Sequence, residues 1–356
     1  MLSKAPASYG VSYIGSKNKI AAEVVYNLPS APLLIDVFAG GGAITHAALL
    51  SHRFRSILAN DYDCGALQLF YRASHGLIDF EEERKRWVSR EDFKRLKDTD
   101  PIVRHHWSFS NGGRDYLYSK EIEPYKRAYH FARNCNDRTE WNAIGLDKFV
   151  PTRLSIRDHA EEIKDIYIRW WLKHNCYEGD IEACIANLKQ DIKLRNSLQN
   201  LERLQSLERL QRLQSLERLQ NLQNLQNLQS LTISKADYKD IFVSEPTTVI
   251  YCDPPYINTS GYEDAIRESG FNHAEFYDWC EAQKGLVVLS EYTAPADRFT
   301  CVWSKEKRVL AAGAKCQSTK VERLFVVKGH EDDYWDLMAA HKPSTLFDQD
   351  QRQAMI

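Results

Sequence analysis

The residues Asp253-Pro254-Pro255-Tyr256 follow directly after the apolar run Val249 to Cys252. Two prolines cannot continue the hydrogen bonding of a central strand, so these residues predict a rigid loop where a strand ends. The loop offers a carboxylate, carbonyl acceptors without competing prolyl N–H groups, and one aromatic ring. The exocyclic amine of a planar base is a poor nucleophile, and acceptors on its hydrogens together with a stacked ring would activate and orient it. Taken alone, the four residues also fit a proline-capped strand with an incidental aspartate.

A second carboxylate lies before a glycine turn, in the segment from Asp36 to Gly42, and a helix is predicted from Ala43 to Leu50. Glycines let a ligand approach the backbone closely. The spacing is not GxGxxG, which argues against a dinucleotide-binding loop. Asp61 follows the run Ser56 to Asn60, where an acidic side chain can accept hydrogen bonds from ribose hydroxyls. A helix N-cap is the alternative role for Asp61.

Short apolar runs predict the strands that position these residues. They are Leu33 to Phe38, Ser56 to Asn60, Leu231 to Ile233, Thr248 to Cys252, Leu286 to Leu289 and Leu324 to Val327. Continuous apolar strands that alternate with helices are typical of a parallel sheet covered on both faces. The predicted fold class is therefore α/β, with the carboxylates gathered at the carboxyl edge of the sheet.

A leucine repeat precedes the second half of this pattern. Leucine occupies every third position from Leu198 to Leu231, without glycine or proline between. A step of three lags an α-helical turn by about 60°, so the leucines would wind around a helix instead of forming a coiled-coil seam. Helix propensity favours that helix, and a tighter threefold coil or small solenoid is the alternative. We interpret the repeat as a spacer that packs on itself.

Composition excludes several classes of protein. The chain has 356 residues, 43% hydrophobic and 27% charged, with a formal net charge of -2, so it is not a wholly basic nucleic-acid coat. No apolar stretch of about 18 residues predicts a membrane span, and no secretory signal is visible. The cysteines are scattered without a CxxC pair. These features predict reduced thiols and a cytoplasmic location.

Four segments in this order resemble the motifs of the Dam-type DNA adenine methyltransferases. Tyr13 to Lys17 is similar to the N-terminal cofactor motif of that family, and Asp36 to Gly42 is similar to its glycine motif. Asn60-Asp61 resembles its second acidic position, and Asp253 to Tyr256 resembles its catalytic loop. The resemblance covers about the first 70 residues and the stretch from about Leu231 to Gly329.

The resemblance implies a Rossmann-like class I methyltransferase sheet of about seven strands, with an antiparallel hairpin near its C-terminal end. It implies S-adenosyl-L-methionine as the methyl donor. The implied cofactor-binding residues are Tyr13, Lys17, Asp36, Phe38, Gly40, Asp61 and Asp253. The implied catalytic residues are Asp253, Pro254, Pro255 and Tyr256, and Asp253 would face both the cofactor and the target adenine.

The same comparison predicts four parts of the chain. Residues 1–70 and 231–330 form the S-adenosylmethionine-binding catalytic domain, and residues 71–195 form an inserted, mainly helical target-recognition domain. Residues 196–230 form the leucine-repeat segment, and residues 331–356 form a C-terminal tail.

An adenine inside a duplex must be flipped out before its amino group can be reached. Residues 101–138 hold seven lysines or arginines against four acids, with seven aromatic residues between them. Basic groups neutralise phosphates and aromatic rings can wedge or stack, so this part predicts contacts with double-stranded DNA. The candidate DNA-binding residues are Asn111, Arg114, Lys120, Lys126 and Arg127. A small domain with an aromatic core and a solvated charged face is the alternative, and we expect most of the tyrosines to be core.

We expect no metal, because a sulfonium is already an activated methyl donor. His105, His106, Cys135 and Cys176 fit no standard zinc spacing, and surface histidines with buried thiols are the simpler interpretation. The leading hypothesis is a site-specific DNA methyltransferase that modifies the exocyclic amine of adenine. The alternatives are a cytosine exocyclic-amine methyltransferase and a non-catalytic DNA-binding or scaffold protein built around the leucine repeat. Host protection by restriction-modification, phage self-modification and regulation all fit the leading hypothesis, which sets no oligomeric state or recognition sequence.

Overall fold

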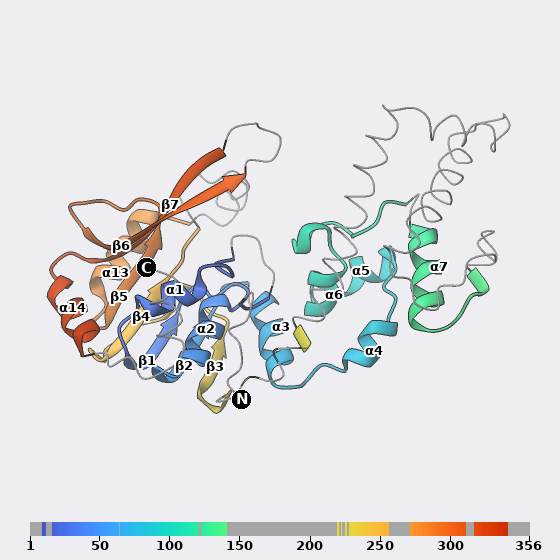
Figure 1. Ribbon diagram of the computed structural model, residues 1–356, viewed down its shortest axis with the longest axis horizontal. Coiled ribbons are helices and arrows are strands. Elements are labelled where there is room, and N and C mark those ends of the chain that lie inside the picture. Colours follow the sequence, from blue (N-terminus) through green and yellow to red (C-terminus); the bar gives the residue numbers. More distant parts are fainter. Residues whose placement is uncertain are drawn as a thin grey trace, which may run out of the picture. The chain divides into compact units, whose positions relative to one another are not determined.

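The computed structural model describes residues 9–11, 16–63, 65–120, 123–140, 219–220, 222, 225, 228–255, 271–310 and 317–340. The chain divides into two compact units (Figure 1). The first unit comprises Met1–Leu77 and Arg218–Ile356, and the second comprises Ile78–Glu217. Each unit has a hydrophobic core of its own.

A seven-stranded sheet forms the centre of the first unit, in the order β3-β2-β1-β4-β5-β7-β6 (Figure 1). The strands are β1 (Ala31–Asp36), β2 (Phe54–Asn60), β3 (Leu231–Ser234), β4 (Thr248–Cys252), β5 (Leu286–Glu291), β6 (Phe299–Leu310) and β7 (Gln317–Val327). Strands β1 to β5 run parallel, whereas β7 is antiparallel to both β5 and β6. The expectation of a mixed α/β sheet of about seven strands is thus confirmed.

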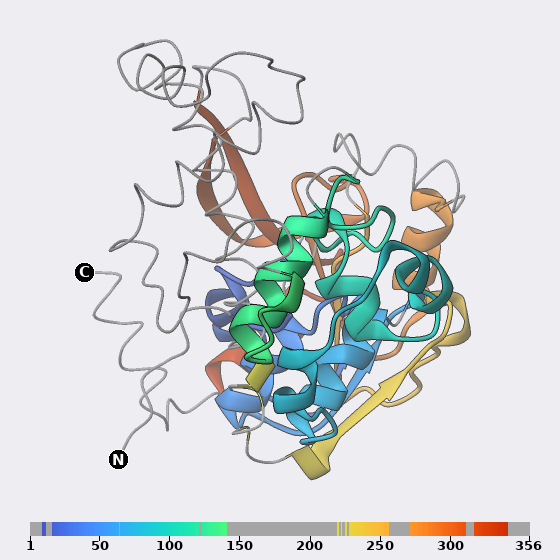
Figure 2. The same ribbon diagram turned by 90° about the vertical axis from the view of Figure 1, so that its right-hand side faces the viewer.

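The apolar runs of the sequence become buried strands. Every residue of β4 and of β5 is buried, as expected for central parallel strands that are covered on both faces. β1 begins at Ala31 and ends at Asp36, two residues before the end of the predicted run. β6 and β7 form a long two-stranded ribbon that extends beyond the other strands (Figures 1 and 2).

Five helices of the first unit are described. They are α1 (Ala21–Tyr26), α2 (Ala43–Ser51), α3 (Gly65–Ser74), α13 (His273–Ala282) and α14 (Glu331–Ala339). On one face of the sheet, alternate residues of β1, β4, β5 and β7 share a core with Phe276 of α13 and with Tyr238. On the opposite face, Thr45 of α2 hydrogen-bonds to Asp36. The sheet therefore separates an apolar face from a face that also carries charged residues.

The described part of the second unit is mainly helical. Its helices are α4 (Phe80–Lys85), α5 (Arg90–Leu96), α6 (Pro101–His106) and α7 (Glu123–Asn134). The side chains of Asp79, Ser89 and Asp100 accept hydrogen bonds from the first backbone N–H groups of α4, α5 and α6. Such caps satisfy donors that have no partner within the helix, which explains where these short helices begin.

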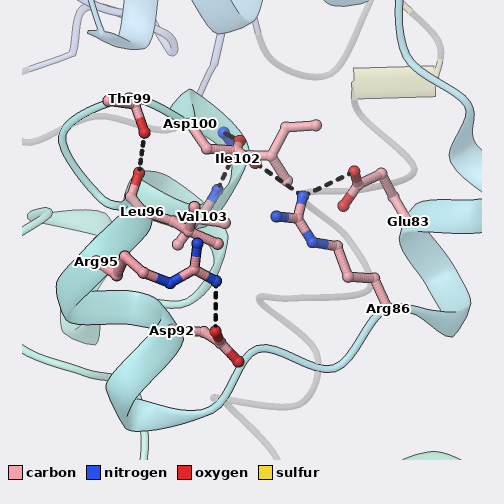
Figure 3. A network of polar contacts seen from close by, with 9 residues as sticks. All are labelled: Glu83, Arg86, Asp92, Arg95, Leu96, Thr99, Asp100, Ile102 and Val103. Atoms are coloured by element: carbon pink, nitrogen blue, oxygen red, sulfur yellow. Dashed lines mark hydrogen bonds and ion pairs between the residues drawn. The ribbon is translucent and has the colours of Figure 1, made fainter.

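Arg86 joins two of these helices (Figure 3). Its Nη1 lies 3.1 Å from Glu83 Oε1 in α4 and 2.8 Å from Asp100 Oδ2. The other carboxylate oxygen of Asp100 accepts hydrogen bonds from the backbone N–H groups of Ile102 and Val103. Asp100 therefore caps α6 and ties its first turn to α4.

Most of the leucine repeat lies outside the described residues, so its conformation stays a prediction. At its C-terminal end, Leu219, Leu222 and Leu231 are buried, and Leu231 begins β3. Within the segment predicted as a tail, Tyr334 of α14 is buried and its hydroxyl donates to Asn27 O at 2.8 Å. In the described parts of the chain, no helix combines the length and the apolar character needed to cross a bilayer.

Candidate active site

Three aspartates lie at the carboxyl ends of three adjacent parallel strands. Asp36 is the last residue of β1 and lies opposite Ala59 of β2 and Tyr251 of β4. Asp61 follows the end of β2, and Asp253 follows the end of β4. Asp61 and Asp253 are both close enough to Asp36 to raise its pKa. The structure thus brings together the three carboxylates that were predicted from separate parts of the sequence.

The glycine turn after β1 is shaped by left-handed backbone conformations. Gly40 and Gly42 have φ angles of 51° and 71°, and a Cβ on Gly42 would lie 2.9 Å from the ring of Phe70. Both values favour glycine, because other residues seldom adopt positive φ. Asp61 Oδ2 accepts the N–H of Gly40 at 2.8 Å, and Oδ1 accepts the N–H of Asp63 at 2.9 Å. Asp61 therefore fixes the turn across the sheet edge, and it is not the N-cap of α3, which begins at Gly65.

Asp36 is the most deeply buried of the three carboxylates. Its Oδ2 accepts a hydrogen bond from Thr45 Oγ1 at 2.7 Å. Among the described residues, none hydrogen-bonds to its buried Oδ1. Burial, together with the nearby charges of Asp253 and Asp61, raises the pKa of Asp36 from 3.8 to about 7. The site therefore contains a carboxyl group that changes protonation near neutral pH and has an acceptor atom to offer.

Lys17 connects the predicted cofactor motif to the predicted catalytic loop. Its Nζ lies 2.8 Å from Asp253 Oδ1 and 3.1 Å from Glu322 Oε1. Burial by itself would lower the pKa of Lys17, but the charges of Asp253 and Glu322 and the hydrogen bonds to them raise it above its ordinary value. Lys17 is therefore a protonated ammonium between two carboxylates.

The described part of the predicted catalytic loop is Asp253-Pro254-Pro255. The imidazole Nε2 of His273 lies 2.9 Å from Pro255 O. A carbonyl oxygen can only accept, so Nε2 must carry the proton and donate. His273 is the first residue of α13, whose N-cap is Asn272. Tyr13 and Tyr256, which complete the two motifs in the sequence, lie outside the described residues.

Phe38 lies in an aromatic cluster on the apolar side of the sheet. Its ring centroid lies 5.5 Å from that of Phe276, 5.8 Å from Tyr238 and 5.9 Å from Phe271. The ring is only partly buried, and Gly40, two residues later, is partly buried as well. These contacts hold Phe38 beside the glycine turn.

Several residues near these carboxylates were not predicted from the sequence. Tyr62, directly after Asp61, is 71% exposed. Tyr292 follows β5, and Lys17, Asp253 and Glu322 all influence its pKa. Adjacency to Asp61 was an available signal for Tyr62, whereas Glu322 lies next to Arg323, ahead of the apolar run of β7, and gave no signal. His273 had no signal, because its contact with Pro255 depends on where α13 begins.

The predicted DNA-binding residues lie on two segments of the second unit. Arg114 and Lys120 are exposed and Asn111 is partly exposed, in a loop that is closed by the bridge between Ser108 and Tyr116. Lys126 and Arg127 lie on α7, where Arg127 pairs with Glu140 at 2.9 Å. Phe109, at the start of the loop, is 59% exposed and was not among the predicted DNA-binding residues.

Two of the tyrosines of this segment lie in a core, as expected. Together with Trp107, Tyr116 and Tyr118 are buried in the core of the second unit.

The histidines and the cysteine of this segment differ from the expectation. His105 and His106 are buried, at 5% and 6% exposure, and Cys135 is exposed. The expectation of surface histidines was wrong, because the C-terminal end of α6 is buried, and the expectation of buried thiols was wrong for Cys135, which follows the end of α7. Cys176 lies outside the described residues. The described residues contain no group of three or more His, Cys, Asp or Glu side chains that could hold a metal ion.

Comparison with known proteins gives one family match. Residues 13–137 match the family described as D12 class N6 adenine-specific DNA methyltransferase. The matched segment includes Lys17, Asp36, Asp61 and the loop around Arg114, and it ends before Asp253. No curated protein matches the chain. This segment is thus similar to the D12 class N6 adenine-specific DNA methyltransferases, in agreement with the Dam-type resemblance, and that family consists of enzymes that methylate adenine in DNA.

Proposed function

We propose that this protein transfers a methyl group from S-adenosyl-L-methionine to the exocyclic amine of a flipped-out adenine in a specific sequence of double-stranded DNA. The observation that carries the proposal is the convergence of Asp36, Asp61 and Asp253 at one sheet edge, with Lys17 bound to Asp253. The family match supports adenine in DNA as the substrate. The methyl donor, the flipped base and the residue roles are our inference.

The acceptor groups at the sheet edge fit the donor groups of this cofactor. Its ribose hydroxyls and its α-ammonium group all donate hydrogen bonds. Asp36 Oδ1 is buried and, within the described chain, lacks a hydrogen-bond partner. The carboxylate of Asp61 retains acceptor sites beside the two N–H groups that it binds. We therefore assign Asp36 and Asp61, with Lys17, Phe38 and Gly40 around them, to the cofactor pocket, and the motif match adds Tyr13.

When bound, S-adenosyl-L-methionine supplies a methyl group on a sulfonium, so a nitrogen–carbon bond can form as the carbon–sulfur bond breaks and the sulfur becomes a neutral thioether. The role of Asp253 and of the Pro254 carbonyl is to accept the two hydrogens of the adenine amine, which moves its lone pair out of the ring plane. One of these hydrogens leaves as a proton after the transfer. Tyr256 would stack on the flipped base and offset part of the cost of unstacking it. This chemistry calls for no metal.

We assign the parts of the chain as the motifs suggest. Residues 1–70 and 231–330 bind the cofactor and carry the chemistry, and residues 71–195 read the DNA. Residues 196–230 act as a spacer, and residues 331–356 follow the catalytic domain. Support comes from the placement of every described catalytic and cofactor candidate in the first unit, whereas Asn111, Arg114, Lys120, Lys126 and Arg127 lie in the second.

The loop from Ser108 to Tyr116 is the best candidate for the DNA reader. Phe109 N donates to Asp115 O at 2.8 Å and Gly113 N donates to Ser108 Oγ at 2.9 Å, so the loop is held in one shape. It presents an exposed ring at Phe109 and an exposed guanidinium at Arg114. An arginine can read guanine edges and a ring can wedge between base pairs, whereas Lys120 would bind phosphate.

Modification-sensitive sequencing of DNA from cells that express the protein tests the proposal. The host should lack methylated adenine of its own, and the matched control is a strain that expresses Asp253→Ala. We expect N6-methyladenine in one sequence context with the unaltered protein and none with the variant. Methylated cytosine would instead favour the cytosine alternative. Unmodified DNA from cells that contain the folded, unaltered protein would favour the non-catalytic alternative.

A further inference from the structure

Glu322 of β7 is a buried acidic residue next to the half-buried Arg323. Phe325 faces the apolar core, so Glu322 and Leu324 lie on the opposite side of β7, which is the side of Asp36. Glu322 is 3% exposed. Carboxylates are seldom buried without partners, because desolvation penalises the charged form. The position of Glu322 therefore requires specific contacts.

The contacts of Glu322 lead directly to the candidate catalytic residue. Glu322 Oε1 accepts hydrogen bonds from Lys17 Nζ at 3.1 Å and from Ser290 Oγ at 3.2 Å. Lys17 Nζ also donates to Asp253 Oδ1 at 2.8 Å. A chain of charged groups thus runs from a strand of the sheet, through Lys17, to the loop that follows β4.

This chain gives the flexible side chain of Lys17 one rigid partner. A lysine has four rotatable carbon–carbon bonds, and an ammonium bound to one carboxylate can still rock about it. Glu322 is held by a hydrogen-bonded strand and by Ser290 of β5, so it is the rigid end. Asp253 lies one residue beyond the end of β4, in the loop that follows the strand. A rigid anchor for Lys17 is therefore also an anchor for Asp253.

Other titratable groups face the same cluster. Asp36 reaches it from β1, Tyr251 from β4 and Tyr292 from the end of β5. Burial is the main cause that raises the pKa of Tyr251 and of Tyr292, and the carboxylates Asp253 and Glu322 raise it further. Both phenols are therefore neutral near pH 7, and Glu322 and Asp253 are the groups that pair with Lys17.

We propose that Glu322 is a positioning residue for methyl transfer: it anchors the Lys17 ammonium, and through Lys17 it holds the Asp253 carboxylate in the orientation that receives the target amine. The inference rests on the proposed function for the role of Asp253. It assigns a task to a residue outside the motifs that carry the family resemblance. Glu322 touches Lys17, and it reaches Asp253 only through it.

The first test follows Lys17 itself and needs no turnover. Lysines are labelled by reductive ¹³C-methylation, the Lys17 signal is assigned with Lys17→Arg, and its titration is followed by NMR. In Glu322→Gln the Lys17 ammonium loses one carboxylate partner, so we expect its proton affinity to fall about tenfold or more. The control Glu275→Gln removes a carboxylate from the exposed pair with Lys239, 2.5 Å apart, and should leave the Lys17 signal unchanged.

The second test separates positioning from binding. We expect Glu322→Gln to lower kcat about tenfold or more, with KM for DNA and for S-adenosyl-L-methionine changed less than about threefold. The alkaline limb of the kcat profile should move to lower pH together with the Lys17 titration. Glu322→Asp keeps the charge and should restore part of kcat, whereas Ser290→Ala, which keeps both ion pairs, should cost less than Glu322→Gln.

An unchanged Lys17 titration in Glu322→Gln would overturn the inference whether or not the unaltered protein methylates DNA. So would a kcat and pH profile equal to those of the unaltered protein. If Glu322→Gln proves poorly folded, Glu322→Asp supplies the same two measurements in a protein that keeps the charge. Absence of methylation by the unaltered protein, with the expected shift at Lys17, would count against the proposed function and leave the Glu322–Lys17–Asp253 linkage standing.

Discussion

Asp36 and His46 are buried on the same side of the sheet, and burial moves their proton affinities in opposite directions. Burial and the charges of Asp253 and Asp61 together raise the pKa of Asp36 from 3.8 to about 7. Burial lowers the pKa of His46 from 6.5 to about 4, and His46 Nδ1 accepts the N–H of Gly10 at 3.0 Å. Both groups are therefore neutral in the folded protein at mildly acidic pH.

The signs of their contributions to stability follow from linkage. The folded protein holds the Asp36 proton more tightly than the unfolded chain does, so this contribution is full below pH 3.8 and is lost as pH rises towards 7. The folded protein holds the His46 proton less tightly, so that contribution is full above pH 6.5 and is lost as pH falls towards 4. The two slopes oppose each other over nearly the same range.

We predict that single variants expose these opposed slopes. Asp36→Asn removes the contribution of the aspartate, so that of His46 remains. As pH is raised from 4 to 6.5, the free energy of unfolding of this variant should therefore increase, by about 3 kcal/mol at most. His46→Asn keeps an acceptor near the Nδ1 position and removes the contribution of the histidine. As pH is raised over the same range, the free energy of unfolding of this variant should decrease. Urea denaturation of both variants at several pH values measures these free energies. Subtracting the two values at each pH removes the contributions of the other titrating groups, which both variants share. Parallel curves would contradict the assigned shifts.

At the scale of elements, α13 contacts the proposed catalytic loop through its first residue. His273 donates from Nε2 to Pro255 O, and the imidazole keeps that donor in both its neutral and its charged form. Asn272 Oδ1 accepts hydrogen bonds from the N–H groups of Ala274 and Glu275, which fixes where the helix begins and so where the ring lies. α13 is therefore a brace for the loop as well as a cover for the sheet.

We predict that the donor at Nε2, and not the ring as such, supports turnover. The amide nitrogen of His273→Gln can approach the Nε2 position, whereas that of His273→Asn approaches Nδ1. His273→Gln should retain most of kcat. His273→Asn and His273→Ala should lower kcat about tenfold, because the loop carbonyls lose their orientation. Steady-state kinetics at saturating cofactor, with the melting temperature of each variant, measure this. Equal rates in all three variants, or rates that follow stability alone, would refute the role of His273.

The sequence predicts those parts of the site that follow from strand order. Asp36, Asp61 and Asp253 meet because parallel strands place their carboxyl ends at one edge, and each carboxylate lies at the end of an apolar run. Lys17 was predicted only through the motif resemblance. Its partner Glu322 could not be predicted, because that contact depends on the antiparallel register of β7 against β5 across 305 residues of chain. His273 was missed for the same reason, since loop contacts are not encoded by local pattern.

For the whole molecule, the family match includes only some of the residues to which the proposed function assigns a role. The match covers residues 13–137, which include the cofactor motifs and the loop around Arg114, whereas the Asp253 loop lies in the first unit beyond the match. The chain therefore returns to its sheet after the second unit and supplies β4, Asp253 and Glu322 there. Assembly of the proposed site thus requires both segments of the first unit to fold together.

The second unit carries its own test, because its loop can be altered without touching the sheet. Arg114 is exposed, and Lys97 Nζ contacts only its backbone carbonyl at 3.2 Å, so Arg114→Ala should leave the fold intact. A base-reading arginine is worth about 1–3 kcal/mol of discrimination. We therefore predict that Arg114→Ala weakens DNA binding and relaxes the sequence preference of methylation.

The matched control is Arg95→Ala, which removes the same charge from an exposed position on α5, 68% exposed and paired with Asp92. It should change affinity slightly and site choice not at all, since a charge away from base edges adds only a sequence-independent attraction. Binding titrations at fixed salt, together with sequencing of methylated sites for both variants, separate the two effects. An equal loss of DNA affinity in both variants would mean that Arg114 contributes only a sequence-independent charge. An unaltered sequence preference in Arg114→Ala would mean that other residues read the DNA.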